Sequence, residues 1–286
     1  MVIGAGGLLG RALNRRLERD FPGTIAATRS EIDVTDPFRL EAEVERLQPT
    51  VLINCAAWTD VDGCTRDPGR AMSVNAEGAA NVARVAAVSG CRVVLVSTDF
   101  VFDGKGSRPY TESDAPNPLG DYGRSKLEGE RRVAAAAADH LIVRTAWLYG
   151  AGGRTFVDRI RRQAEAGEPL RVVSDQFGSP TWVEDLSVGI VRLLGTPYRG
   201  IVHVANRGAC SRHALAAAVL EVLGLTGRVS LQATQTVPLP GIAPRPACAA
   251  LDTGLYERLT GAAMRPWEEA LADYLSAGPA GHRGEA

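Results

Sequence analysis

The chain has 286 residues, 45% of them hydrophobic, and a formal net charge of -1. This size allows a substantial core in one or two domains, while the near-neutral charge gives no electrostatic reason to expect nucleic-acid or membrane binding. No apolar run reaches the about 18 residues of a membrane span, no signal peptide is visible, and the five cysteines form no zinc or disulfide pattern. These features predict a cytoplasmic protein.

The chain opens with a glycine-rich turn between a strand and a helix. Gly4, Gly7 and Gly10 follow a short apolar run, and residues 8–17 have apolar positions at helical spacing. Such glycines let the backbone turn sharply and approach a pyrophosphate at the helix N-terminus, so the pattern predicts a dinucleotide site. The strand would span only residues 1–3, so either it is unusually short or the chain begins upstream.

The residues after the second strand bear on the choice of cofactor. A strand is expected at residues 24–28, and an acidic residue at its end would bind the ribose 2′-hydroxyl of NAD. Arg29 stands there instead and suits a 2′-phosphate, which favours NADPH. Glu31 keeps NADH as the alternative, and Arg29 could also be a plain surface residue.

Apolar runs alternate with helical periodicity through the first half of the chain. This alternation predicts an α/β fold with a doubly wound parallel sheet of the Rossmann type. We expect residues 1–150 to form a dinucleotide-binding domain and residues 151–286 mainly a smaller substrate-binding lobe with a frayed tail at 276–286. Within the second part, segments from about 170–208 are expected to return to the main sheet, through strands at 170–173 and 201–204.

A tyrosine and a lysine stand four residues apart on an expected helix. Tyr122 and Lys126 would share one helix face, and Lys126 is one of only two lysines in the chain. A nearby ammonium favours the phenolate, so we expect Lys126 to lower the pKa of Tyr122 and to make it a usable proton donor. Alone, this spacing is more often a solvated helix face.

Two further groups are expected at the carboxyl ends of the strands, where open α/β sheets bind ligands. Thr98 and Asp99 follow the strand at 92–96, and Ala56 and Ala57 follow the strand at 51–55, where small side chains let a cofactor approach. A hydroxyl, a phenol and an ammonium together form the set that a carbonyl reductase requires.

Taken together, these residues resemble extended short-chain dehydrogenases/reductases, and most closely the dTDP-4-dehydrorhamnose reductases. The resemblance runs to about residue 185, with a weaker trace at Arg245 and Pro246. Its blocks are GAGGLLG (4–10), NCAAWTDVD (54–62), VNAEGAANVA (74–83), STDFVFDG (97–104), YGRSKLEGE (122–130), RTAWLYG (144–150) and DQFGSPTW (175–182).

The resemblance implies hydride transfer from NADPH or NADH to the C4 keto carbon of a nucleotide-linked 6-deoxy sugar. Tyr122 would protonate the developing alkoxide, Thr98 would hydrogen-bond the same oxygen, and Lys126 would bind the nicotinamide ribose. The other implied contacts are Gly4, Gly7, Leu8, Leu9, Gly10, Arg29, Asp33, Ala56 and Ala57 for the cofactor, Thr59, Val61, Asp99, Trp147 and Arg245 for the substrate, and Asn75 as a support. Trp147 would either stack on the sugar or pack in the core.

The chain departs from the family pattern at several positions. Ile3 replaces the usual Thr before the glycines, and Phe100 replaces a Tyr. Near the C-terminus, Cys248 and Ala249 replace two polar residues, so Arg245 would carry more of any diphosphate binding. The sugar or nucleotide could therefore differ from the family's usual substrate.

Several alternatives stay open. One is a 4-ketoreductase for another deoxysugar, of the dihydrostreptose type, and another is a non-catalytic NADP-binding subunit like the regulatory subunit of methionine adenosyltransferase. Dehydration is disfavoured because Phe100 stands where a dehydratase has Glu, and epimerisation is disfavoured by the blocks at 97–104 and 175–182. We expect no resident metal, although a magnesium requirement stays open, and either a monomer or a homodimer.

Overall fold

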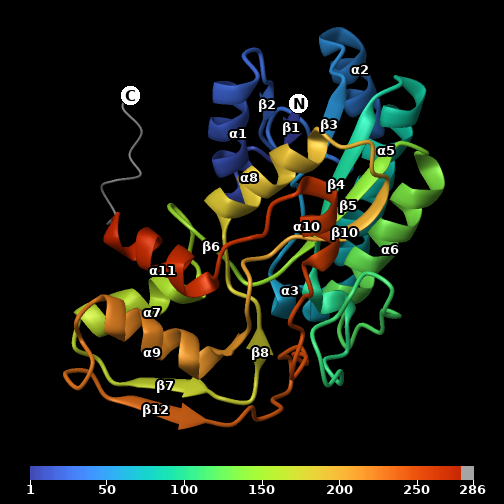
Figure 1. Cartoon of the computed structure of the whole chain (residues 1–286). Helices are drawn as coiled ribbons and strands as arrows, with labels where there is room; N and C mark the ends of the chain where they lie inside the picture. The colour runs from blue at the N-terminus through green and yellow to red at the C-terminus, as the bar shows by residue number, and fades with distance from the viewer. Residues whose placement is uncertain (278–286) are drawn as a thin grey trace.

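A six-stranded, wholly parallel sheet is the main sheet of the computed structural model, which describes residues 1–277 (Figure 1). The predicted doubly wound α/β class is confirmed. In spatial order, the strands are β10 (Gly200–His203), β5 (His140–Thr145), β4 (Arg92–Thr98), β3 (Val51–Asn54), β1 (Val2–Ile3) and β2 (Ala26–Ala27). Strand β1 lies between β2 and β3, so the order reverses there, which is where such sheets bind ligands.

Helices cover both faces of the sheet, which explains why its strands read as apolar runs. Because successive side chains point to opposite faces, Val2 packs with Leu13 on one side while Ile3 packs with Val82 on the other. The first face is covered by α1 (Leu8–Asp20) and α8 (Val183–Leu194), and the second by α2 (Pro37–Leu47), α5 (Gly78–Val88) and α6 (Asp121–Ala136).

Short helical segments connect β3 to α5. These are α3 (Val61–Arg66), α4 (Pro68–Met72) and a π-helical turn, Ser73–Glu77, that runs directly into α5. Helical backbone is therefore continuous from Pro68 to Val88, with the π-helical turn inside it. A 3₁₀ turn, Asp99–Val101, follows β4.

The smaller lobe has its own core, in which Ile160, Leu215 and Leu271 are buried together. Figure 1 shows it beyond the ends of the main strands. It contains α7 (Phe156–Glu165), α9 (Arg212–Val222), α11 (Trp267–Ser276) and the strand pairs β7 (Leu170–Val173) with β12 (Leu231–Thr234), β8 (Phe177–Gly178) with β11 (Cys210–Ser211), and β6 (Leu148–Tyr149) with β9 (Thr181–Trp182). Helix α10 (Gly254–Thr260) packs against α8 and β10.

One prediction about the returning segments is wrong. β10 joins the main sheet beside β5, as expected, but β7 pairs in parallel with β12 in the smaller lobe. The partner of β7 lies about 60 residues further along the chain, at a distance that local periodicity cannot reveal. Of the tail expected to fray at 276–286, residues 278–286 lie outside the described residues.

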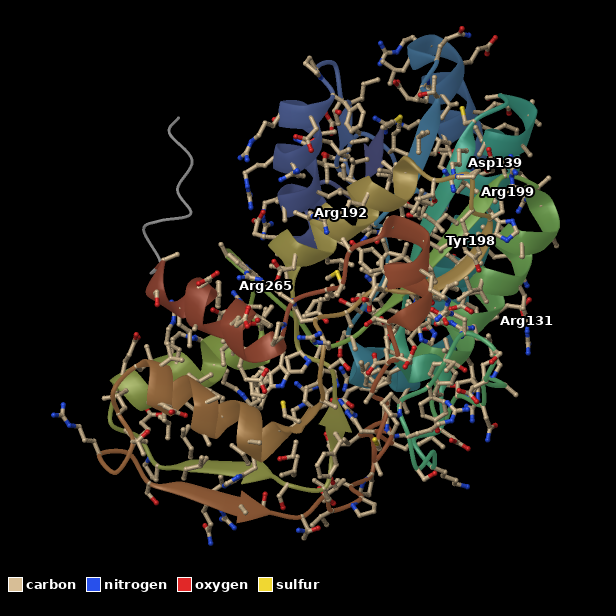
Figure 2. The ribbon with its side chains drawn as sticks, in the orientation of Figure 1. Arg131, Asp139, Arg192, Tyr198, Arg199 and Arg265 are labelled. Carbon is tan, nitrogen blue, oxygen red and sulfur yellow. The ribbon has the colours of Figure 1, made fainter. Side chains whose placement is uncertain are left out.

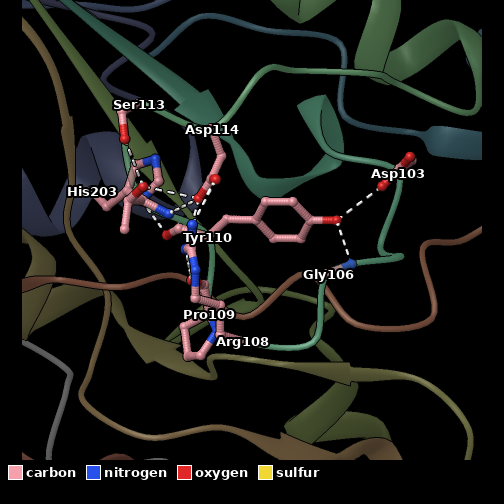
Figure 3. A network of polar contacts seen from close by, with 9 residues as sticks. Asp103, Gly106, Arg108, Pro109, Tyr110, Ser113, Asp114 and His203 are labelled. Atoms are coloured by element: carbon pink, nitrogen blue, oxygen red, sulfur yellow. Dashed lines mark hydrogen bonds and ion pairs between the residues drawn. The ribbon is translucent and has the colours of Figure 1, made fainter.

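The connection from β4 to α6 is long but well anchored (Figure 3). The Tyr110 hydroxyl donates to Asp103 Oδ1 and accepts from the Gly106 amide, each at 2.9 Å. The Tyr110 carbonyl oxygen lies 3.0 Å from Nδ1 of His203 on β10, and Arg108 forms a 2.8 Å ion pair with Asp114. These contacts hold residues 103–114 of the connection in place beside β10.

Candidate active site

A cavity of about 970 Å³ opens between the carboxyl ends of the main strands and the smaller lobe. It is lined by Cys55 after β3, Thr98 at the end of β4, and Trp147 after β5. From the opposite side, α7, β7 and α9 contribute side chains. The structure thus places the cavity where the sheet topology predicts a ligand site.

The glycine-rich turn fits a dinucleotide for a steric reason. Gly4 has a φ of +79°, and a Cβ built on it would lie 2.7 Å from the Ala56 nitrogen. A Cβ on Gly10 would lie 2.2 Å from the Gly4 carbonyl oxygen. No side chain caps α1 at Gly7, and its first turn carries no acidic residue, so the helix N-terminus offers uncompensated N–H donors.

A second cavity, of about 240 Å³, extends from the glycine turn toward β2. It brings together Arg29, Asp33, Ala56 and Ala57, and it shares Gly7, Cys55 and Ala57 with the larger cavity. Arg29 is largely exposed and lies 3.3 Å from Asp33. Sequence reasoning missed Arg70, whose guanidinium lies 4.4 Å above the Trp58 ring at the same cavity.

Thr98, Tyr122 and Lys126 all line the larger cavity and are buried, with Lys126 only 2% exposed. Lys126 Nζ donates to the Val96 carbonyl oxygen at 2.7 Å. Burial lowers the pKa of Lys126 to about 8, while the Glu130 carboxylate acts in the opposite direction. The hydroxyl, the phenol and the ammonium therefore face one space, as the reductase set requires.

The expected lowering of the Tyr122 pKa is wrong for this structure. Burial raises the pKa of Tyr122 well above its usual range; a hydrogen bond with Thr98 opposes the shift and the Asp99 carboxylate adds to it. Desolvation of the phenolate dominates, and the Lys126 ammonium is engaged with a backbone carbonyl. Tyr122 is consequently a neutral phenol near pH 7, the form that a proton donor needs.

Asn75, in the π-helical turn, ties the helix of Tyr122 to the loop after β3. Its side chain accepts from the Trp58 amide at 2.8 Å and donates to the Trp58 carbonyl and to Ser125 Oγ. A Cβ on Gly129 of α6 would lie 2.4 Å from the Asn75 carbonyl oxygen. The backbones of α6 and of the π-helical turn are therefore in close contact there. The supporting place implied for Asn75 matches these contacts.

The residues implied to bind the substrate line the same cavity, namely Thr59, Val61, Asp99, Trp147 and Arg245. Burial raises the pKa of Asp99 to about 7. Trp147 has a φ of +45°, and Arg245 pairs with Asp62. The departures Cys248 and Ala249 lie elsewhere, where their amides donate to the carbonyls of Gly104 and Phe177.

Sequence reasoning missed most of the positive charge in the cavity. Beside Arg245, the cavity wall contains Arg154, Arg159, Arg162, Arg171 and Arg212, whereas Asp99 is the one acidic residue among residues 1–277 that lines it. The high arginine content of the whole chain hid this concentration. Within residues 1–277, no group of His, Cys, Asp and Glu is arranged to hold a metal ion, and no helix is long and apolar enough to cross a membrane.

A doubly wound parallel sheet, a glycine turn at its switch point and a Tyr–Lys pair beside a strand-end Thr define a reductase of the extended short-chain dehydrogenase/reductase type. The family model described as the RmlD substrate binding domain matches residues 1–278. The chain belongs to this family, that of the dTDP-4-dehydrorhamnose reductases, and is accordingly a nucleotide-sugar reductase of this type.

Individual relatives agree over almost the full length. The chain is 38% identical to a spore coat polysaccharide biosynthesis protein of Bacillus subtilis, covering 96% of both chains, and 38% identical to a dTDP-4-dehydrorhamnose reductase of Streptomyces griseus, covering 97% of this chain and 93% of that one. The crystal structure of the dTDP-4-dehydrorhamnose reductase of Bacillus anthracis, in complex with NADP, matches with a TM-score of 0.91 at 34% identity over 96% of each chain.

Proposed function

We propose that this protein uses NADPH to reduce the C4 keto group of dTDP-4-dehydrorhamnose, giving dTDP-L-rhamnose. The observation that carries the proposal is the meeting of Thr98, Tyr122 and Lys126 in one cavity that joins the glycine turn to an arginine-rich wall. Family membership supports the reaction class. The arginines suit a substrate that carries a diphosphate.

In the proposed mechanism, the bound dinucleotide supplies the hydride, and the protein supplies positioning and a proton. Tyr122 is protonated at neutral pH, as a phenol of ordinary or raised pKa is, and it gives that proton to the C4 oxygen as negative charge develops there. Thr98 donates its hydroxyl to the same oxygen. Lys126, held by Val96, presents its remaining donors to the ribose.

The substrate is tested by following NADPH oxidation with the keto sugar made in situ, with and without the epimerase that precedes the reduction. Turnover only with the epimerase, and rhamnose as product, supports the proposal. Turnover without the epimerase would identify the protein as the reductase of a different 4-keto sugar. NADPH binding without any turnover would favour a regulatory subunit.

Arg29→Ala tests the choice of cofactor. Arg29 is exposed at the second cavity, with only a 3.3 Å contact to Asp33, so a 2′-phosphate can recruit it. We expect the KM for NADPH to rise by about tenfold, the effect of about 1.4 kcal/mol of lost charge-assisted binding, with the KM for NADH nearly unchanged. Equal losses for both cofactors would contradict the assignment.

A further inference from the structure

Arg212 enters the cavity from the smaller lobe and has no role in the mechanism above. It is the first residue of α9, and its amide donates to the Gln176 carbonyl oxygen at 3.0 Å. Its guanidinium lies 3.5 Å above the centroid of the Trp147 ring and 4.9 Å from that of Phe156. Two aromatic residues and a fixed backbone thus hold this cation in place.

The guanidinium of Arg212 is nevertheless short of acceptors. Within residues 1–277, no hydrogen bond or ion pair engages it, whereas Arg245 on the same wall pairs with Asp62. Burial lowers the pKa of Arg212 to about 10, so the group stays charged at neutral pH. A guanidinium has five N–H donors, and leaving them unpaired in a partly desolvated site is unfavourable unless a ligand accepts them.

The charged groups around Arg212 indicate that its ligand would be an anion. Asp99 acts on it from the side of Thr98 and Tyr122, and Arg159 and Arg245 act on it as like charges. Asp99 Oδ2 is itself buried without a hydrogen-bond partner. Arg212 is therefore within electrostatic reach of Asp99 and of two further cations in the same cavity, and an anion bound there would offset the repulsion among the three arginines.

We propose that Arg212 binds the phosphate nearest the sugar in the nucleotide-diphosphate substrate, and so sets the sugar between Asp99 and Trp147. The planar guanidinium can give two parallel hydrogen bonds to one phosphate. The guanidinium also covers one face of the Trp147 indole. The sugar would therefore contact Trp147 at its edge or on its other face. The sugar part of this assignment rests on the proposed function, but the diphosphate part does not.

The test compares nucleotides with and without the second phosphate. Binding of dTDP and dTMP is measured by calorimetry in the presence of saturating NADPH, for the wild type, Arg212→Gln and Arg212→Lys. The control is Arg207→Gln, the same change at an exposed arginine of the same lobe that lies outside the cavity lining.

We expect Arg212→Gln to raise the Kd for dTDP by about tenfold or more while changing that for dTMP by less than about twofold; tenfold corresponds to about 1.4 kcal/mol. Arg212→Lys should restore part of the loss because it keeps the charge but not the planar fork. Binding of NADPH should be unchanged in both variants, and Arg207→Gln should match the wild type throughout.

Three results would overturn the proposal. Equal weakening of dTDP and dTMP binding by Arg212→Gln would show that Arg212 contacts the nucleoside or supports folding. Unchanged dTDP binding with a raised KM for the keto sugar would place Arg212 on the sugar itself. A wild type that does not bind dTDP would remove both this assignment and the proposed function, whereas dTDP binding that depends on Arg212 without keto-sugar turnover would remove only the latter.

Discussion

Tyr122→Phe is expected to lower kcat by about 10²-fold or more, the scale of a lost general acid. The phenol is buried in the cavity beside Thr98, and its ring packs edge to face with Phe100 at 5.4 Å. Phenylalanine keeps this packing and removes only the hydroxyl. The measurement is single-turnover NADPH oxidation with saturating keto sugar, so that product release does not mask the chemical step.

The same variant should bind NADPH with nearly wild-type affinity and unfold at nearly the wild-type temperature. Tyr110→Phe is the matched control, since its hydroxyl serves the loop network between Asp103 and Gly106 and lies outside the cavity lining. Full turnover by the Tyr122 variant would remove the phenol from the mechanism.

Of the variants considered, Arg144→Met should cause the largest decrease in the free energy of unfolding. Arg144 on β5 and Glu130 on α6 form a bidentate pair, with distances of 2.9 and 2.6 Å and side-chain exposures of 2% and 3%. Ser97 donates to the same carboxylate. Removing the guanidinium leaves the Glu130 charge buried, which should lower the free energy of unfolding by about 3–5 kcal/mol.

The measurement for Arg144→Met is urea unfolding in the absence of ligands. Arg199→Met is the matched control, because the 3.2 Å ion pair of Arg199 with Asp139 is exposed at the sheet edge (Figure 2) and should contribute at most about 1 kcal/mol. Similar losses for the two variants would show that the carboxylate at Glu130 is protonated or hydrated when its partner is removed. The account of a dry, paired junction between β5 and α6 would then be wrong.

The parts of the fold that could be predicted from the sequence depend on local signals. The turn at Gly4 to Gly10 could be predicted because glycine is required at positions where a Cβ would clash with backbone atoms. The strands of the first half read as apolar runs because helices cover both of their faces. Tyr122 and Lys126 converge because a helix places positions four apart on one face.

The parts that could not be predicted depend on long-range packing. The sequence of β7 has the apolar pattern of a strand in the main sheet, but β7 pairs with β12 in the smaller lobe. The place of Arg212 in the cavity could not be predicted, because it depends on stacking against Trp147, which is far away in the sequence. The sign of the Tyr122 pKa shift was missed because the spacing to Lys126 says nothing about how deeply the phenol is buried.

As a reductase of this type, the protein is expected to deliver a hydride to C4 of a nucleotide-linked keto sugar. The most direct measurement uses NADPH carrying deuterium at both C4 positions of the nicotinamide, with the keto sugar prepared by the epimerase, and analyses the product by mass spectrometry and NMR. We expect one deuterium per molecule, located at C4 of the deoxysugar, and its loss in Tyr122→Phe under the same conditions. NADPH oxidation without deuterium in the sugar, or deuterium at any other carbon, would contradict it.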